Sequence, residues 1–262
     1  MSNNAITVAT ANTYESRMLQ HNDGLLPFVE SGVDVLLLQE VLGMNEATTR
    51  ARLMQDGYVL VQYAGELGLA TALHQDFADK AVITHAKQVS IHQPSTTEVL
   101  MKRLQPHSHR LRPRGMLVLG LAASDTQPNL FIANTHPIIF ARAVARHKQV
   151  RAIQAALSSP IYDGSRLILA GDMNHYPAPH TVDRRMHQAL RLQMAKLDRS
   201  TWPVQGTKHE WMARIGSLVT HSIDAFDANL DAMLYRGVTE LDTRVVDIHS
   251  DHRAVVTTFD IP

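Results

Sequence analysis

The sequence predicts an α/β fold, because short apolar segments with the composition of strands alternate with segments of helical periodicity. Residues 5–11 are rich in β-branched side chains, and residues 33–38 are apolar apart from Asp34. Residues 140–157 place Ala, Val and Ile on one helical face. No repeat or long linker interrupts the 262 residues, so we expect one domain spanning residues 1–262.

Strands in the N-terminal half are predicted to run into polar residues. The first strand, residues 5–11, ends at Asn12, and the second, residues 33–38, ends in Gln39 and Glu40. The other predicted elements are a helix from Asn22 to near Gly32, a helix over residues 45–55 with Asn45 as its N-cap, and strands at residues 58–63, 68–73 and 81–91, the last as one strand or two.

An apolar strand at residues 167–170 organises the C-terminal half. Gly171 is expected to end this strand in a tight turn that presents Asp172 and Asn174. A turn closed by an Asx hydrogen bond is the structural alternative to a binding site there. The remaining predicted elements are strands at residues 116–122, 129–133, 230–235 and 254–259, a turn at 125–128, and helices at 140–157 and 182–197.

The balance of charge gives no global electrostatic case for a polyanionic partner. Lysine plus arginine and aspartate plus glutamate each number 25, so the formal net charge is zero. Two local basic groups remain, at residues 102–114 and on the 140–157 helix, and we interpret both as solvated surface. Arg114 is the exception, because it enters a strand close to the candidate site described below. The helix face consists of Arg142, Arg146, His147, Lys148 and Arg151.

The chain has no cysteine, which excludes disulfides, thiolate metal sites and a cysteine nucleophile. The first residues lack the basic start and apolar run of a signal peptide, and no apolar stretch reaches membrane-spanning length. We therefore expect a cytoplasmic protein without a membrane span, and no obligate protein partner is evident.

Polar side chains that can bind a metal or a phosphate follow most of the predicted strands. Each has a structural alternative: Glu40 as a helix cap, Asp231 as a turn residue, His252 as an exposed loop histidine. Ligands of α/β proteins bind at the carboxyl ends of strands, so the recurrence of such residues there favours a site. The candidates are Asn12, Glu40, Asn134, His136, Asp172, Asn174, Asp231, Asp251 and His252.

The order of these residues resembles the endonuclease/exonuclease/phosphatase superfamily, which includes pancreatic-type deoxyribonuclease and neutral sphingomyelinases. The resemblance implies an α/β (α+β) four-layer sandwich of two packed mixed β-sheets flanked by helices, with the site at one end. It also implies hydrolysis of a phosphoester with a divalent cation, usually Mg²⁺, with Mn²⁺ as a substitute. The matching motifs are Asn12, Gln39-Glu40, Asn134-Thr135-His136, Gly171-Asp172-Met173-Asn174, Leu230-Asp231-Ala232-Met233-Leu234 and Ser250-Asp251-His252.

Carried over position by position, the resemblance implies a metal site centred on Glu40. Asn12 and Asp251 would help to form the metal's surroundings, and Asp172 would position or deprotonate the attacking water. Mg²⁺ prefers one or two carboxylates together with retained waters, which suits a sparse site of this kind.

The same resemblance implies a set of phosphate contacts. Asp231 and His252 would form an acid–imidazole pair, in which the carboxylate fixes the tautomer of the ring and favours its charged form. His136 would bind the phosphate or assist departure of the leaving group. The residues expected to contact substrate are Asn174, Asn134 and Arg114.

Three functions remain open at this point. The expected one is a Mg²⁺-dependent phosphodiesterase of the endonuclease/exonuclease type, acting on DNA, RNA or a nucleotide-like diester. The alternative is a phosphatase or a sphingomyelinase-like phospholipase acting on a small or lipid-linked phosphoester, although no interfacial amphipathic helix is evident. The third is a binding protein that kept the fold and lost the chemistry, against which the intact candidates argue.

Tyr14 stands where apurinic endonucleases carry an aspartate, whereas Asn134-Thr135-His136 resembles the deoxyribonuclease and sphingomyelinase branches.

Overall fold

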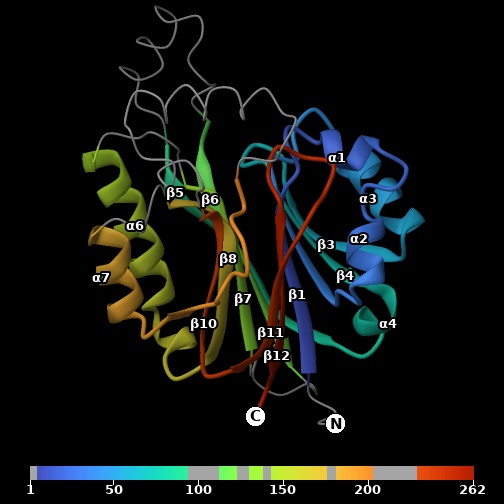
Figure 1. Ribbon diagram of the computed structural model, residues 1–262. Coiled ribbons are helices and arrows are strands. Elements are labelled where there is room, and N and C mark those ends of the chain that lie inside the picture. The colour runs from blue at the N-terminus through green and yellow to red at the C-terminus, as the bar shows by residue number, and fades with distance from the viewer. Residues whose placement is uncertain (1–4, 94–111, 123–129, 138–142, 176–180, 203–228) are drawn as a thin grey trace, which may run out of the picture.

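The computed structural model describes residues 5–93, 112–122, 130–137, 143–175, 181–202 and 229–262, which form two β-sheets with helices on their outer faces (Figure 1). Each sheet has six strands within these ranges. Sheet A contains β1 (Ala5–Asn12), β2 (Val35–Gln39), β3 (Tyr58–Ala64), β4 (Leu69–His74), β11 (Thr239–Val246) and β12 (Ala254–Asp260), in the order β11-β12-β1-β2-β4-β3. Sheet B contains β5 (Val82–His92), β6 (Arg114–Ala122), β7 (Leu130–Thr135), β8 (Arg166–His175), β9 (Gln193–Met194) and β10 (Asn229–Arg236), in the order β5-β6-β7-β8-β10-β9.

The helices complete a four-layer sandwich, as the resemblance implied. The outer face of sheet A is covered by α1 (Arg17–Gln20), α2 (Leu26–Glu30) and α3 (Glu46–Gln55), whereas α6 (Ala143–Leu157) and α7 (Thr181–Ala189) cover sheet B (Figure 1). The short helix α4 (Gln75–Ala78) follows β4 and packs Phe77 and Ala78 against the core between the sheets. A 3₁₀ turn at Pro160–Tyr162 leads from α6 toward β8. Every helix in the described ranges is too short or too polar to span a bilayer.

Alternating side chains of the central strands divide the core into three layers. In β1, Val8 packs between the two sheets, whereas Ala9 packs against the helices of sheet A. In β7, Ile132 faces sheet A and Phe131 faces α6. Successive side chains of a strand point to opposite faces, so strands buried on both sides must be apolar at nearly every position. This explains the continuous apolar runs that identified them in the sequence.

Strand direction brings the candidate residues to one edge of the sandwich. β1 runs parallel to β2 and β7 runs parallel to β8, while β6, β10 and β12 run antiparallel to their neighbours. The carboxyl ends of β1, β2, β7 and β8 therefore meet the beginnings of β6, β10 and β12. This edge lies opposite the two termini, at the top of the molecule in Figure 1.

Most of the predicted elements are confirmed, and Asn45 caps α3 by accepting a hydrogen bond from the Thr48 amide at 2.9 Å. The helix predicted over residues 182–197 was too long, since α7 ends at Ala189 and β9 follows it. β11 was not predicted at all. The turn predicted at 125–128, and residues 129 and 140–142 of two predicted elements, lie outside the described ranges.

Arg146 corrects the interpretation of the α6 basic face as wholly solvated. Its side chain is buried, and its guanidinium donates to the Met173 carbonyl at 2.7 Å and to Asp183 at 2.6 Å. A charged group is buried only when it is paired and hydrogen-bonded, and Asp183 of α7 supplies that pairing. Arg146 therefore joins both helices to the β8 segment that carries Asp172 and Asn174.

The prediction that Gly171 ends its strand was wrong, since β8 continues to His175. The glycine is required instead by a close approach of β7. Gly171 has φ 147°, and a Cβ atom there would lie 1.8 Å from the carbonyl oxygen of Thr135. Only a residue without a side chain allows the two parallel strands to pair at this point.

We predict that Gly171→Ala lowers the free energy of unfolding by about 3 kcal/mol or more, because β7 and β8 must separate to admit the methyl group. Gly32→Ala is the matched control: Gly32 also has a positive φ, 62°, but nothing lies within 4 Å of its added Cβ. This control should lose only about 1 kcal/mol. Urea denaturation of both variants measures the difference, and equal losses would contradict the role of close strand approach.

Candidate active site

The candidate site is the polar end of the layer between the two sheets. Asn12 continues the alternation of Ile6 and Val8 in β1, and Asp172 continues that of Ile168 and Ala170 in β8. Both residues are buried, and the Asn12 side-chain amide donates to Asp172 Oδ2 at 3.0 Å across the two sheets. The sandwich therefore holds functional side chains at its edge by the same packing that holds its apolar core.

Asp172 is fixed by hydrogen-bond donors at both carboxylate oxygens. Oδ2 accepts from Asn12 and lies 3.3 Å from His136 Nε2, and Oδ1 accepts from the Asn174 backbone amide at 3.2 Å. Burial, together with the nearby charge of Asp231, raises the pKa of Asp172 to about 6, although His252 and the donated hydrogen bonds oppose this shift. A carboxyl group in that range can accept a proton near neutral pH.

Asp231 and His252 form the predicted acid–imidazole pair. His252 Nδ1 lies 2.7 Å from Asp231 Oδ2, and both side chains are buried. Burial lowers the pKa of His252, but the charge and hydrogen bond of Asp231, with further help from Asp172, raise it overall to about 10. The ring is therefore a cation at neutral pH. Ligand atoms of Asp172, Asp231 and His252 all lie within 4.8 Å of one another.

The regular pairing of β8 with β10 places Asp172 opposite Asp231, and a bulge in β8 follows directly after this pair. Asp231 pairs with Asp172 and Asn229 pairs with His175, so β8 uses three residue steps where β10 uses two. The extra residue lies where Asn174 has φ 52°, a left-handed conformation that asparagine tolerates better than most residues. Two carboxylates on directly paired positions repel each other, and His252 offsets that repulsion.

His136 and Arg114 both reach the site, but His136 is neutral and Arg114 is a cation. His136 is buried at 4% exposure, and burial and then Arg114 hold its pKa well below the usual value. Its Nδ1 atom is buried without a hydrogen-bond partner in the described structure. Arg114 begins β6, and the charges of Glu40 and Asp172 act on it while burial lowers its pKa. It therefore remains a cation beside the two acids.

Glu40 is held in a strained backbone conformation directly after β2. Its φ is 56°, which costs a residue with a long side chain of order 1–3 kcal/mol and is found mainly at functional sites. One carboxylate oxygen, Oε2, accepts from the Glu15 amide at 3.3 Å. Burial and the charge of Asp172 raise the pKa of Glu40, with His252 and Arg114 opposing and Asp251 adding to the rise.

Ser250 ties the third predicted metal ligand to the first strand. Its hydroxyl donates to the Asn12 carbonyl at 2.7 Å, accepts from the His252 amide, and lies 3.4 Å from Asp251 Oδ1. The Asn12 side-chain oxygen accepts from the Tyr14 amide at 3.0 Å. A carbonyl oxygen has two lone pairs, so this contact leaves Asn12 able to accept a second partner.

No protein-family model and no curated protein matches the sequence. Solved structures do match the fold over nearly its whole length. An endonuclease/exonuclease/phosphatase family protein from Bacteroides thetaiotaomicron superimposes with a TM-score of 0.66 at 16% identity, covering 98% of both chains. TDP2 from D. rerio, complexed with a single strand DNA product, gives 0.67 at 14% identity and covers 98% of this chain and 99% of its own. The human Nocturnin catalytic domain with bound sulfate gives 0.63 at 17% identity, covering 98% and 95%.

The chain has the endonuclease/exonuclease/phosphatase fold. In this fold the sequence motifs that carried the resemblance meet at one edge, although they are spread from Asn12 to His252. Asp172 contacts both Asn12 and His136, and Asp231 contacts His252. Glu40, Arg114 and Asp251 interact electrostatically with this group. Asn174 reaches it through its backbone amide, while its side-chain amide donates to the Pro137 carbonyl at 3.0 Å.

Asn134 is the predicted substrate contact that its surroundings do not support. It is fully buried, its amide donates to the carbonyls of Leu38 at 3.0 Å and Ala70 at 2.9 Å, and its oxygen accepts from Gln39 at 2.8 Å. These contacts cross from sheet B to two strands of sheet A. We therefore assign Asn134 to the joining of the sheets of this fold, since its amide hydrogens are already donated.

Thr201 supports the site but was missed in the sequence. Its hydroxyl accepts the Asp231 amide at 3.2 Å, and its carbonyl accepts the Arg253 amide at 2.8 Å. The residue is fully buried between the segments that carry Asp231 and His252. It follows no apolar strand pattern, so periodicity gave no signal for it.

We predict opposite protonation of the two site histidines in the metal-free protein. An NMR titration of the imidazole rings from pH 6 to 8 should show His252 charged and His136 neutral throughout. Because the pKa of His252 is raised from 6.5 to about 10, the stabilisation from its ion pair is present below pH 6.5 and lost as the pH rises toward 10. Asp231→Asn should lower the pKa of His252, and an unchanged titration in that variant would refute the pairing.

We also predict that Asn134→Ala lowers the free energy of unfolding by about 1–3 kcal/mol, because the buried carbonyls of Leu38 and Ala70 each lose the Asn134 donor. The Gln39 amide loses one acceptor but keeps those of Thr10 and Leu37. For turnover, the KM of the folded fraction should stay close to that of the wild type. A variant of unchanged stability with a raised KM would instead return Asn134 to substrate binding.

Proposed function

We propose that the protein is a Mg²⁺-dependent phosphodiesterase that hydrolyses a phosphoester bond in nucleic acid or in a nucleotide-like diester. The observation that carries the proposal is the buried group of Asp172, Asp231 and His252, within 4.8 Å of one another and beside the strained Glu40. An ionisable acid, a cationic imidazole and a further carboxylate at one edge of this fold supply the proton acceptor and the charge that phosphoester hydrolysis needs.

The donor set of the site fits a divalent cation. Glu40, Asp172, Asp231 and Asp251 act on one another with negative charge, and in the described structure their cationic partners are His252 and Arg114. Burial, and then repulsion by Asp172 and Asp251, raises the pKa of Glu40, and a cation of charge two would relieve that repulsion. Carboxylate oxygens are ligands that Mg²⁺ prefers. In our proposal Glu40 and Asp251 hold the metal, with the side-chain oxygen of Asn12 beside them.

The chain's own side chains would divide the remaining work. When bound, a divalent cation neutralises the phosphate oxygens and makes a water more acidic. Asp172, oriented by Asn12 and by the Asn174 amide, accepts the proton of the attacking water. His252 and Arg114 bind non-bridging oxygens as cations. His136 is neutral and approaches the other side of Asp172, where it can assist the leaving group.

Asn174 would donate a hydrogen bond from its side-chain amide to a phosphate oxygen. One of the two amide hydrogens is free for this, because its present contact is long. That amide donates to Pro137 at 3.0 Å, and its other contact, the Asp172 carbonyl, lies at 3.4 Å. The side-chain oxygen is buried and has no hydrogen-bond partner in the described structure. A phosphate oxygen only accepts hydrogen bonds, so a water or a hydroxyl group of the substrate would have to donate to this oxygen, which would remove a desolvation penalty of about 1–3 kcal/mol.

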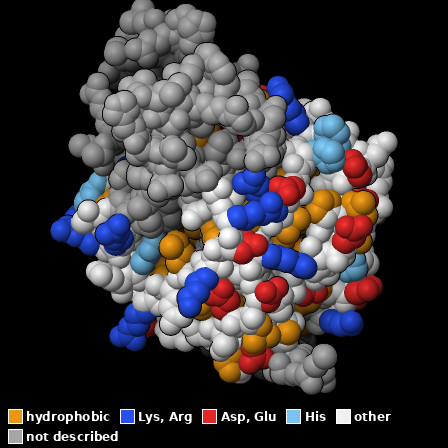
Figure 2. All heavy atoms as spheres, viewed as in Figure 1, with side chains coloured by type: hydrophobic (Ala, Val, Ile, Leu, Met, Phe, Trp, Pro, Cys, Tyr) orange, Lys and Arg blue, Asp and Glu red, His pale blue; other side chains and the backbone are white. Residues whose placement is uncertain are grey.

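The preference for nucleic acid is supported by two observations. TDP2 of the same fold is complexed with single strand DNA, and Nocturnin holds sulfate, an anion of phosphate-like shape. On the face shown in Figure 2, described basic and acidic side chains are interspersed rather than gathered into a basic surface. We therefore expect substrate to be bound mainly by its scissile phosphate and close neighbours, with a correspondingly shallow dependence on salt.

We predict that hydrolysis of a generic phosphodiester requires Mg²⁺ or Mn²⁺ and stops in excess chelator. A screen with Mg²⁺ should include single- and double-stranded DNA, RNA, cyclic nucleotides, sphingomyelin and inositol phosphates. Turnover confined to a sphingolipid or a phosphomonoester would overturn the nucleic-acid assignment, and full turnover in excess chelator would overturn the metal dependence.

We further predict that His252→Ala loses about 10²- to 10⁴-fold in kcat, the contribution of one positioned acid–base or charge-stabilising group. Glu40→Gln should require much higher Mg²⁺ for half-maximal rate, because one anionic ligand is lost. His147→Ala on α6 and Glu30→Gln on α2 are matched controls away from the site. Wild-type rates in a folded His252→Ala protein would remove His252 from the reaction.

A further inference from the structure

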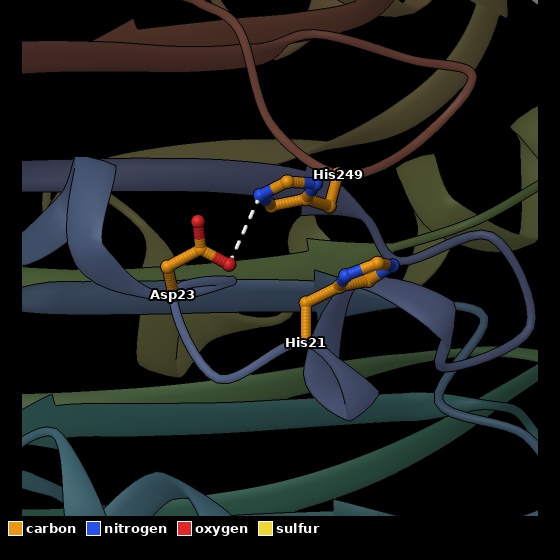
Figure 3. A group of neighbouring side chains, drawn as sticks. All are labelled: His21, Asp23 and His249. Carbon is orange, nitrogen blue, oxygen red and sulfur yellow. Dashed lines mark ion pairs between the residues drawn. The ribbon is translucent and has the colours of Figure 1, made fainter.

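A second group of metal-ligating side chains lies on the surface, outside the candidate active site. His21 and Asp23 follow α1, and His249 belongs to the loop between β11 and β12 (Figure 3). His249 Nε2 lies 3.1 Å from Asp23 Oδ1, and the His21 and His249 rings stack with centroids 4.4 Å apart and planes 11° apart. Segments more than two hundred residues apart in the chain therefore bring two imidazoles and one carboxylate together.

The ligand types and spacing suit a transition metal ion. One ligand atom from each residue lies within 4.8 Å of the other two. A tetrahedral zinc ion with bonds of about 2.0–2.2 Å needs its ligand atoms about 3.3–3.6 Å apart. Asp23 and His249 are already about that close, at 3.1 Å, so the main adjustment is a rotation of His21 toward them. The side chains of His249 and Asp23 are 44% and 61% exposed, which leaves them room to rotate. Two nitrogen ligands disfavour Mg²⁺ and Ca²⁺, which take oxygen ligands.

The backbone under this group is held in place. From α3, Arg52 donates to the carbonyls of Leu19, His21 and Asn22 at 2.9, 2.9 and 3.0 Å, so one guanidinium fixes the turn that carries His21 and Asp23. A Cβ atom added at Gly24 would lie 1.9 Å from the Met18 carbonyl oxygen, which keeps this turn tight. Preorganised backbone lowers the entropy lost when ligands are ordered around an ion.

The other side of the group is anchored as well. Ile248 packs into the core between sheet A and its helices, and the Ser250 hydroxyl donates to the Asn12 carbonyl at 2.7 Å. His249 stands between these two fixed residues. Both halves of the group are thus presented from ordered backbone, and only the side-chain torsions remain to be set by an ion.

We propose that His21, Asp23 and His249 bind one Zn²⁺ ion at the surface, with water completing the coordination. Such an ion would fasten the loop that carries Asp251 and His252 to the turn after α1. The site is separate from the proposed Mg²⁺ site, because none of its three ligands belongs to the catalytic group. It does not depend on the proposed function, since an inactive protein would bind the same ion.

The test is zinc binding to the purified full chain, stripped with chelator and held in excess Mg²⁺ so that the oxygen-rich site is occupied. Calorimetry should show one Zn²⁺ per chain, and His21→Gln, Asp23→Asn and His249→Gln should each weaken it by at least about tenfold, the loss that even an outer-shell partner can cause. His147→Gln is the control for a general loss of a surface imidazole. The three substituted side chains are exposed, so each variant should still fold.

A spectroscopic readout distinguishes the ligands directly. In NMR spectra of the histidine rings, Zn²⁺ should shift His21 and His249 and leave His147 unchanged. Co²⁺ in place of Zn²⁺ should give a visible absorption band that disappears in His249→Gln. Binding that is lost in His252→Gln but kept in His21→Gln would place the zinc in the catalytic group and overturn the proposal. Equal affinity in all variants, or dependence on one histidine alone, would overturn it too.

Discussion

The structure depends on the polar residues that end the apolar layer between its two sheets. Along most of each central strand this layer is apolar, but its last positions are Asn12, Gln39, Asn134 and Asp172. Polar groups can replace apolar ones there only if they satisfy one another, and Gln39 bonds Asn134 while Asn12 bonds Asp172. The same hydrogen bonds therefore close the sandwich and orient Asp172, the acid at the centre of the candidate site.

The negative charges at this edge repel one another and oppose folding, and neighbouring cationic groups offset that repulsion. Asp172 and Asp231 occupy paired positions on adjacent strands, with the His252 cation beside them. Glu40 and Asn174 also hold left-handed backbone conformations that loosely packed surroundings would not maintain. In the proposed function, binding of a cation and a phosphate would offset the cost of these arrangements, which is the expected trade between stability and function.

Sequence reasoning predicted the central strands because burial on both faces makes them apolar at nearly every position, and it predicted the candidate site because polar residues end those strands. It failed where the determining contact is distant in the chain. Gly171 looked like a turn residue, yet the backbone of Thr135 requires it. Arg146 looked solvated, yet Asp183 on the next helix buries it. Asn134 has a side chain of the kind that binds substrate, and only its three hydrogen-bond partners in the structure point to a structural role.

The place of β12 has a consequence for biosynthesis. This last strand lies between β1, the first, and β11, and the residues just before it complete a site that begins at Asn12. During translation, the nascent chain cannot assemble the candidate site until Asp251 and His252 have left the ribosome. Strand pairing between the ends of a chain is also slow to form, because loop closure precedes any gain from contact. A protein built this way would complete its candidate site only after residues 12 to 252 have all been made.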